Sequence, residues 1–361
     1  MKKIDRNAIV FIIHQFQVGG VESVFINLSK IATSRKIYLL IAYDSINVDL
    51  LNKIKNVEVI MMGCKCSSLF SLAKAIFQIK KKVYFGNAHI INFSDTLSTL
   101  IIQAALNGRL NSSWVHCNPN ALLRSRSFLI YKYLLSKNDN IICLCETQKK
   151  LLSEIIPCAS DKIKVIYNYV NENEILALSD EMLLAPSRYI IMVSRFDSRT
   201  KDFKTLIDAY AKLSQDVQNK IKLVLLGDGP DKNDIENYAN STDAKGNVIF
   251  PGRDLNPFKW IRNADFLVHS SLSEGFSLVI LEAMALGKAI ISSDCDCGPA
   301  DILSKGKYGL LFKVGDSVSL NEYIVKLISD NMLCSYFGAL SLERFSSIQK
   351  SSSIRIKEFL E

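Results

Sequence analysis

The sequence predicts an α/β protein built from two parallel sheets, each covered by helices. Short runs rich in Val, Ile and Leu alternate with segments of helical apolar spacing along the whole chain. The alternation stops at a polar stretch, 171–187, and then starts again. A length of 361 residues also suits about two domains. Two similar α/β halves imply a cleft in which a ligand lies beyond the carboxyl ends of the strands.

In the first half, strands are predicted where β-branched residues cluster, and helices where apolar residues recur every three or four positions. Such alternation favours parallel strands with helices on both faces of the sheet. The predicted strands are 7–13, 36–42, 57–62, 89–93, 113–116, 140–144 and 162–167, and the predicted helices are 21–32, 69–79, 96–106, 122–135 and 147–155.

The second half repeats this pattern, and the polar stretch 171–187 is interpreted as the join between the two domains. The tail, 334–361, is predicted to be helical with a serine-rich break at 345–353. The predicted strands are 189–194, 221–226, 248–250, 266–269, 289–292 and 308–312, and the predicted helices are 203–213, 231–239, 256–262, 277–286 and 320–328.

The composition narrows the classes of function. No apolar run reaches the roughly 18 residues of a membrane-spanning helix, and the N-terminus does not resemble a signal peptide. The nine cysteines include no C-x-x-C pair, which favours reduced cytosolic thiols over a zinc site. The sequence contains no H-E-x-x-H motif, Ser-His-Asp order or clear metal-ligand cluster, so no metal is predicted.

Charge is uneven along the chain. Residues 1–178 hold 22 Lys and Arg against 12 Asp and Glu, a net of +10, whereas the remainder holds 22 against 24, a net of −2. A basic first half suits an anionic membrane surface, an anionic lipid or nucleic acid. The sequence shows no nucleic-acid-binding module and no aromatic–basic interleaving, which argues against nucleic acid.

Two carboxylates stand eight positions apart where a helix is predicted to begin. Glu274 precedes the helix and can reach a ligand at its positive end. Glu282 lies inside the helix among apolar residues, where a charge is costly unless a polar group meets it. This spacing suggests a ligand with a phosphate at the helix start and hydroxyls on either side, and a nucleotide sugar is such a molecule.

Basic residues and glycines at other strand ends also suit an anion. Arg195 follows a predicted strand and Lys201 precedes a helix, and the pair suits a diphosphate, with an ordinary exposed loop as the alternative. Gly19 and Gly20 occupy a strand-to-helix turn where backbone can approach an anion, although a plain tight turn fits equally.

Three further residues lie in or after predicted strands. Arg253 ends a segment whose backbone suits a flat base. His116 ends a strand at the predicted edge of the cleft, where a structural role is the alternative. His269 lies inside a strand and is interpreted as structural.

Taken in order, these segments resemble the retaining glycosyltransferases of family 4, and the resemblance is strongest over 189–315. It implies the GT-B fold, in which two Rossmann-like domains flank a central cleft and a C-terminal helix returns to the N-terminal domain. Residues 1–172 with helix 343–361 are then expected to bind the acceptor, and residues 173–342 the donor. The motifs are Gly19-Gly20-Val21-Glu22, His116, 166–170, Ser194-Arg195 with Lys201, Leu226-Gly227-Asp228-Gly229-Pro230 and Glu274-x7-Glu282.

The resemblance also implies the roles of the site residues. Arg195 and Lys201 neutralise the donor diphosphate, Glu274 contacts the donor sugar, and His116 lies near that sugar and the acceptor hydroxyl; these four are the expected catalytic residues. Glu282 accepts the ribose hydroxyls. The family needs no metal, because side chains and a helix end meet the charge of the leaving group. The expected donor-binding residues are Gly19, Gly20, Arg195, Lys201, Arg253, Glu274, Gly275, Phe276, Ser277, Leu278 and Glu282.

Two positions depart from the family pattern. Lys201-Asp202 stands where Lys-Gly is usual, and Asn168-Tyr169 stands where Asn-Pro is usual. Neither change removes a charged residue, so the departures put loop geometry in doubt more than activity.

Segments 298–303 and 306–309 look like bacterial enzymes that build surface polysaccharide, such as O-antigen or capsule. The expected reaction is retaining transfer of a hexose or N-acetylhexosamine from a nucleotide-diphosphate sugar to a lipid-diphosphate-linked glycan. UDP is preferred from its frequency in the family. A sugar-nucleotide epimerase of the same fold and a non-catalytic partner of another transferase are the alternatives.

The expected location is the cytoplasm, with peripheral attachment to the cytoplasmic face of the inner membrane. The predicted helix 122–135 carries Arg124, Arg126, Lys132 and several aromatic residues. It suits a membrane surface, with an amphipathic core helix as the alternative.

Overall fold

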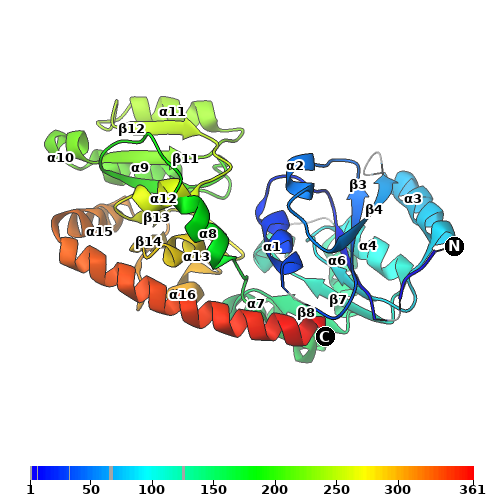
Figure 1. Cartoon of the computed structure of the whole chain (residues 1–361). Helices are drawn as coiled ribbons and strands as arrows, with labels where there is room; N and C mark the ends of the chain where they lie inside the picture. The colour runs from blue at the N-terminus through cyan, green and yellow to red at the C-terminus, as the bar shows by residue number, and fades with distance from the viewer. Residues whose placement is uncertain (1, 6, 32, 65–67, 124–126) are drawn as a thin grey trace. The chain divides into compact units, whose positions relative to one another are not determined.

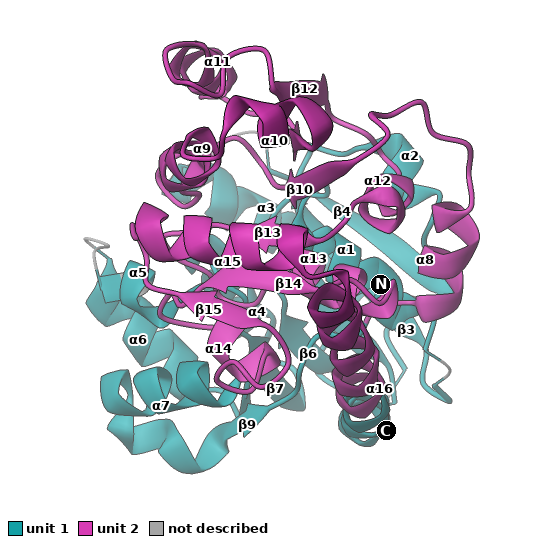
Figure 2. Cartoon of the chain, turned by 90° about the vertical axis from the view of Figure 1, so that its left-hand side faces the viewer, with its two compact units in different colours: residues 1–169, 350–361 teal, residues 170–349 magenta. Residues whose placement is uncertain are grey.

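The computed structural model describes all residues except 1, 6, 32, 65–67 and 124–126. The chain divides into two compact units, coloured separately in Figure 2. Unit 1 comprises residues 1–169 and 350–361, and unit 2 comprises residues 170–349. The predicted domains change over at 172/173 and 342/343, a few residues from these boundaries.

Within its described residues, unit 1 is built on a seven-stranded parallel sheet (Figure 1). Every residue of β2 and β3 is buried, because helices cover both faces of these strands. The strands in sheet order are β4 (Val57–Cys64), β3 (Ile37–Tyr43), β2 (Ile9–Ile13), β6 (His89–Asn92), β7 (Leu110–Trp114), β8 (Asn140–Cys143) and β9 (Ile163–Val165). The α-helices before the C-terminal one are α1 (Gly20–Ser29), α2 (Val48–Leu51), α3 (Leu69–Lys82), α4 (Leu97–Leu106), α5 (Pro119–Leu123), α6 (Phe128–Ser136) and α7 (Glu146–Ile155).

Unit 2 contains a six-stranded parallel sheet over the residues that the structure describes. Its apolar core includes the fully buried Phe196, Tyr210 and Phe266. The strands in sheet order are β12 (Val248–Gly252), β11 (Lys222–Leu226), β10 (Tyr189–Val193), β13 (Leu267–His269), β14 (Ile290–Ser293) and β15 (Leu310–Phe312). The helices are α8 (Glu172–Ser179), α9 (Phe203–Ala211), α10 (Gln215–Lys220), α11 (Lys232–Asn240), α12 (Phe258–Asn263), α13 (Leu278–Ala285), α14 (Pro299–Ile302), α15 (Ser317–Ser329) and α16 (Asn331–Leu360).

The C-terminal helix α16 is continuous, so the predicted break at 345–353 is wrong. Serine lowers helix propensity only modestly, and a small side chain can pack where a larger one would not fit. Ser341 and Ser352 are both fully buried along this helix. Among the serines of the predicted break only Ser352 is buried, Ser346 and Ser347 are exposed, and neither kind of serine interrupts the helix.

The end of α16 is part of unit 1, which confirms the predicted return of the C-terminal helix. Ile356 and Leu360 are buried, and the Phe359 ring packs against His89 and Trp114 at centroid distances of 5.4 and 5.7 Å. Arg355 Nη1 donates to the carbonyl of Val165 in the edge strand β9 at 2.8 Å.

Two further predictions of secondary structure need correction. The polar stretch 171–187 is not only a linker, since it contains helix α8. Asn171 caps this helix, because its side-chain oxygen accepts the Glu174 N–H at 3.3 Å. The predicted helix 122–135 is divided between α5 and α6, and its Arg124 and Arg126 lie outside the described residues. In the described part of the chain, no helix has both the length and the apolar character that crossing a membrane requires.

We predict that Ile356→Ala lowers the free energy of unfolding by about 2–5 kcal/mol, because it leaves a cavity in the core of unit 1. The matched control is Ile354→Ala on the same helix, where the side chain is 50% exposed and should cost far less. Urea unfolding of both variants measures the difference. Equal losses would contradict the packing of α16 described above.

Candidate functional site

Two loops of unit 2 leave the sheet from neighbouring strands and meet. Strands β10 and β13 pair in parallel, with Ile191 opposite Leu267. Strands β11 and β12 follow on one side of β10 and β13 lies on the other, so this is the switch point of the sheet, where such folds bind ligands. Beyond it, Lys201 and Ser271 form an isolated antiparallel bridge. The sequence-predicted Lys201 and Glu274 are brought together here.

Three polar groups meet one oxygen of Glu274. Lys201 Nζ forms an ion pair with Oε1, Ser271 Oγ donates to it at 2.9 Å, and His269 Nε2 lies 3.2 Å away. The side chains of Glu274 and Lys201 are only 13% and 18% exposed. Burial disfavours the charge, but the Lys201 ammonium and the His269 hydrogen bond hold the pKa of Glu274 well below its usual range. This carboxylate is therefore ionised at neutral pH.

The residue after Lys201 fixes its position. Asp202 caps α9 by accepting the Thr205 N–H at 3.1 Å. The Asp202 N–H donates to the carbonyl of Ser270 at 3.1 Å, and Ser270 Oγ donates back to the carbonyl of Asp202 at 2.9 Å. The aspartate that departs from the family's Lys-Gly pattern thus supplies a helix cap and links the two loops.

Arg195 leaves the same edge of the sheet but is not part of this cluster. Its side chain is exposed and makes no hydrogen bond or ion pair with Lys201 or Glu274 among the described residues. It lies near Asp197, whose pKa is lowered to about 2 mainly by hydrogen bonds from Arg199, with a smaller effect of the Arg195 charge. Arg195 and Lys201 both belong to the loop between β10 and α9, and of the two only Lys201 forms an ion pair with Glu274 among the described residues.

The segment after Glu274 turns tightly into α13. Gly275, Phe276 and Ser277 are buried, and Ser277 is the N-cap residue before Leu278. The first turn of a helix presents backbone N–H groups and the positive end of its dipole. Gly298 packs against this turn: a Cβ at its φ of +91° would lie 3.1 Å from Phe276 Cα, so the approach requires glycine.

Glu282 lies one turn inside α13, apart from the Glu274 cluster. Burial raises its pKa to about 7, and none of the described residues forms a hydrogen bond or ion pair with its carboxylate. Arg253 is exposed and follows the edge strand β12, which β11 separates from β10. The structure does not bring Arg253 to Lys201 and Glu274.

In unit 1, His116 follows β7 at the carboxyl edge of the sheet. The N–H groups of His116 and Cys117 donate to Asp95 Oδ2 at 2.8 and 2.7 Å. The His116 ring packs on Phe93 at 4.5 Å, and burial lowers its pKa to about 3, so it is neutral at physiological pH. Its Nε2 is buried and has no hydrogen-bond partner in the described part of the chain. Burial raises the pKa of Asp95 to about 6.

Gly19 and Gly20 form the start of α1, where Gly19 is an extended N-cap residue. The Glu22 carboxylate folds back over this turn, and its Oε1 accepts the Gln17 N–H at 3.4 Å. A Cβ on Gly19 would lie 2.7 Å from Glu22 Oε2, so glycine leaves room for this carboxylate. Burial raises the pKa of Glu22.

Comparison with known proteins identifies the family. Residues 181–341 match the family described as glycosyl transferases group 1. An uncharacterized glycosyltransferase of Methanocaldococcus jannaschii is 28% identical over 278 residues, covering 68% of this chain and 68% of that protein. The chain is a glycosyltransferase, and the part of it that matches the group 1 family, 181–341, lies within unit 2.

Two named relatives of this glycosyltransferase act on bacterial glycans. The N-acetylgalactosamine-N,N'-diacetylbacillosaminyl-diphospho-undecaprenol 4-alpha-N-acetylgalactosaminyltransferase of Campylobacter jejuni is 27% identical over 221 residues, covering 60% of this chain and 59% of that protein. The lipopolysaccharide core biosynthesis glycosyltransferase LpsE of Rhizobium meliloti is 32% identical over 176 residues, covering 48% and 49%. The chain spans between 49% and 68% of the length of the three relatives named here.

Solved structures show the fold of the glycosyltransferase. Anabaena HepE in complex with UDP-glucose matches with a TM-score of 0.77 at 19% identity, covering 98% of this chain and 98% of that one. The apo form of the lipopolysaccharide outer core galactosyltransferase WaaB matches with a TM-score of 0.71 at 20% identity, covering 98% and 99%. The predicted GT-B fold with two Rossmann-like domains is thereby confirmed.

Sequence reasoning missed three polar residues around these sites. His269 was interpreted as structural, yet its ring contacts Glu274, and neither Ser271 nor Asp95 was singled out. The signal for His269 is its place at the end of β13, five positions before Glu274, because side chains at strand ends border the ligand edge. Asp95 carries the same signal, since it follows β6.

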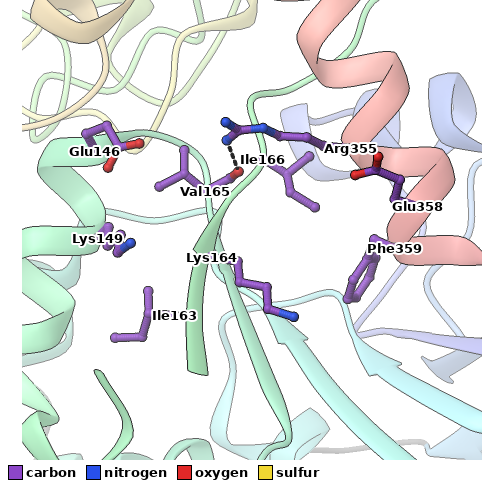
Figure 3. Close-up of a pocket in the computed structure, with 9 residues that line it drawn as sticks. All are labelled: Glu146, Lys149, Ile163, Lys164, Val165, Ile166, Arg355, Glu358 and Phe359. Atoms are coloured by element: carbon purple, nitrogen blue, oxygen red, sulfur yellow. Dashed lines mark hydrogen bonds between the residues drawn. The ribbon is translucent and has the colours of Figure 1, made fainter. Parts of the chain in front are cut away.

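A cavity of about 440 Å³ lies in unit 1 away from all of these residues (Figure 3). It is lined by α7, β9 and the end of α16, and Arg355 crosses it to reach the Val165 carbonyl. A smaller hollow of about 270 Å³ in unit 2 includes Lys201 and Asp202 in its wall.

We predict that Glu282→Gln stabilises the glycosyltransferase at pH 8 but not at pH 4.5. The folded-state pKa of Glu282 is raised from 4.5 to about 7, so the folded state binds this proton more tightly than the unfolded state. The charged form therefore lowers stability progressively as pH rises from 4.5 through 7. Scanning calorimetry at the two pH values measures the effect.

The matched control for this experiment is Glu322→Gln in α15, where the side chain is exposed. It should show the same difference from wild type at both pH values. A Glu282→Gln difference that does not change with pH would contradict the half-buried environment of this carboxylate, which has no partner among the described residues.

Proposed function

We propose that this glycosyltransferase transfers a hexose or N-acetylhexosamine from a nucleotide-diphosphate sugar, preferably UDP-linked, to a lipid-diphosphate-linked glycan, with retention of configuration. The observation that carries the proposal is the ionised Glu274 beside Lys201 at the switch point of unit 2. The HepE structures contain UDP or UDP-glucose, which supports a UDP donor. The Campylobacter relative is named for a diphospho-undecaprenol acceptor, which supports a lipid carrier.

In this proposal, unit 2 binds the donor diphosphate through N–H donors and cations, and it binds the donor hydroxyls through carboxylates. The amides at the start of α13 meet the diphosphate, because a helix N-terminus favours negative charge. Lys201 has three N–H donors, of which Glu274 and Ser271 engage two, so one remains for a phosphate oxygen. Arg195 is proposed to add its charge from the same loop as Lys201. Glu282 is proposed to accept the ribose hydroxyls.

Glu274 is proposed to hold the donor sugar through its second oxygen. The hydrogen bonds from Lys201, His269 and Ser271 to this carboxylate all end on Oε1. None of the described residues donates a hydrogen bond to Oε2, which is therefore available to sugar hydroxyls. A fixed carboxylate that needs no reorganisation during the reaction stabilises the transition state efficiently.

The proposed chemical step is a front-face displacement. The bond between the anomeric carbon and the donor phosphate breaks while the acceptor oxygen attacks the same face, and the departing phosphate oxygen takes the acceptor proton. Lys201 and the α13 amides stabilise the charge that develops on the diphosphate. His116 of unit 1 is neutral, with an unpartnered Nε2, and is proposed to hydrogen-bond the sugar or acceptor hydroxyl. No step in this proposal uses a metal.

The proposed partner surface is the cytoplasmic face of the inner membrane, contacted by unit 1. On α3, Phe70 is 82% exposed and Phe77 is 61% exposed, and the helix carries Lys74, Lys80, Lys81 and Lys82 without an acidic residue. On α6, Leu129 is 76% exposed and Tyr133 is 60% exposed. Exposed aromatic and aliphatic side chains interleaved with lysines suit an anionic bilayer interface.

We predict that Glu274→Gln and Lys201→Ala each lower turnover at least about a hundredfold, the effect of removing one positioned charge at a reaction centre. The control is Lys220→Ala, an exposed lysine at the end of α10, which should leave turnover unchanged. The assay follows sugar transfer from a panel of nucleotide sugars to a lipid-linked glycan extract, with NMR of the product for anomeric configuration.

Three outcomes of that assay would overturn the proposal. Conversion of a nucleotide sugar without acceptor would indicate an epimerase. Donor binding with no product from any acceptor would indicate a non-catalytic partner. Near-normal turnover of both variants would remove Glu274 and Lys201 from the reaction.

We predict that Phe70→Ser combined with Phe77→Ser weakens binding to vesicles rich in anionic lipid, measured by flotation. The matched control is Met182→Ser combined with Leu184→Ser in unit 2, where the side chains are 88% and 93% exposed but proposed to lie away from the bilayer. Equal losses for both pairs, or binding that ignores anionic lipid content, would remove α3 from the membrane surface.

A further inference from the structure

His269 ends β13 and is almost completely buried, at 2% exposure. Its ring lies between two polar groups from different parts of unit 2. Nε2 faces Glu274 Oε1 at 3.2 Å and Ser271 Oγ at 3.3 Å, whereas Nδ1 faces Ser292 Oγ at 3.1 Å. Ser292 belongs to β14, the strand next to β13. The imidazole therefore connects the sheet to the carboxylate.

We propose that His269 is a positioning residue that donates a hydrogen bond from Nε2 to Glu274 Oε1, and that the Glu274 carboxylate fixes the tautomer of the ring. The inference rests on the proposed function, because it assigns a role toward the same donor-sugar site. His269 contacts no substrate in this scheme and acts only through Glu274.

The tautomer of the His269 ring follows from which of its partners can donate a hydrogen bond and which can only accept one. Oε1 of an ionised carboxylate can only accept, so Nε2 must carry the proton for the 3.2 Å contact to be a hydrogen bond. In the neutral ring Nδ1 is then an acceptor, and the Ser292 hydroxyl can donate to it at 3.1 Å in competition with the Ser293 carbonyl at 3.2 Å. The alternative, Nδ1–H donating to Ser292 Oγ, would direct the Nε2 lone pair at Glu274 and repel it. Because a hydroxyl can donate or accept, the acceptor-only carboxylate of Glu274 selects the tautomer.

The groups that face this pair support the assignment. Burial lowers the pKa of His269, which keeps the ring neutral at physiological pH despite the nearby Glu274. The charged or titratable neighbours are Lys201 from the loop after β10 and Cys295 from the loop after β14, and burial raises the pKa of Cys295 to about 12. Cys295 therefore stays a neutral thiol, and Lys201 and His269 remain the groups that act on Glu274.

Convergence on one oxygen gives the contact a function beyond packing. Lys201, Ser271 and His269 reach Oε1 from three directions, which fixes the carboxylate plane and directs Oε2 away from the protein donors. Without the His269 hydrogen bond, two contacts remain and the carboxylate can rotate. Rotation of the Glu274 carboxylate would misalign the donor sugar, whereas it would change the affinity for the nucleotide much less.

The first experiment observes the tautomer without any assay of activity. The chain has four histidines, so the ¹⁵N resonances of histidine-labelled protein are few, and those absent from His269→Gln belong to His269. At pH 7 the expected signature is a neutral ring with its proton on Nε2, which becomes a mixture of tautomers in Glu274→Gln. A proton on Nδ1, or a ring whose tautomer is unchanged in Glu274→Gln, would overturn the inference.

The second experiment is kinetic. His269→Leu is expected to lower kcat/KM for the donor sugar about 10- to 100-fold, the usual effect of losing a hydrogen bond to a charged group, while the inhibition constant of the free nucleotide stays within about twofold. His269→Gln places an amide N–H near the position of Nε2 and should restore most of the activity.

The matched control is His89→Leu, another buried strand histidine, which pairs through Nε2 with Ser112 Oγ at 2.8 Å but faces no carboxylate. It should lower stability and leave the kinetic constants unchanged. Equal kinetic losses in both variants, or no rescue by His269→Gln, would show a structural role only. An inactive wild-type protein would refute the proposed function, whereas the ¹⁵N result would still decide the inference about His269.

Discussion

Lys201 and Glu274 reach each other from loops 73 residues apart in sequence, and both side chains are mostly removed from solvent. Removing one partner of such a pair leaves an uncompensated buried charge, which costs about 3–5 kcal/mol. The pair can form only if β10 and β13 lie side by side and if the two loops leave them in fixed directions. The Asp202 cap and its two hydrogen bonds with Ser270 supply that direction. The local geometry of unit 2 is therefore organised around keeping one carboxylate charged.

In unit 1, the buried carboxylate of Asp95 has different partners from those of Glu274. Asp95 accepts the backbone N–H groups of His116 and Cys117 but has no basic side chain among its described partners, and its pKa is raised to about 6. The neighbouring His116 is neutral at physiological pH. Unit 2 thus places a cation against its buried carboxylate, whereas unit 1 places backbone N–H groups against Asp95.

The sequence predicts the order of elements well because buried parallel strands carry continuous apolar runs, as in β2, β3 and β10. It fails where packing overrides composition. The serines at 345–353 predict a break, yet they lie inside a continuous helix, where Ser352 is fully buried. The site shows the same limit: Lys201 and Glu274 are recognisable from their motifs, but the contact of His269 with Glu274 depends on how far β13 extends before the loop turns. Spacing places Arg195 and Lys201 in one loop, but it does not reveal which of the two pairs with Glu274.

Glu274 and Glu282 are eight residues apart, and their environments separate their pKa values in opposite directions. A cation and two further donors meet Glu274, so it stays charged whether or not a ligand is present. Glu282 has no such partner among the described residues, and its charged form is disfavoured near neutral pH. Hydroxyl donors placed against Glu282 would stabilise its carboxylate and release a proton. If Glu282 accepts ribose hydroxyls as proposed, nucleotide binding is coupled to this proton, whereas contact of the sugar with Glu274 is not. Within one segment of nine residues, binding of the nucleotide would then depend on pH through Glu282, whereas binding of the sugar through Glu274 would not.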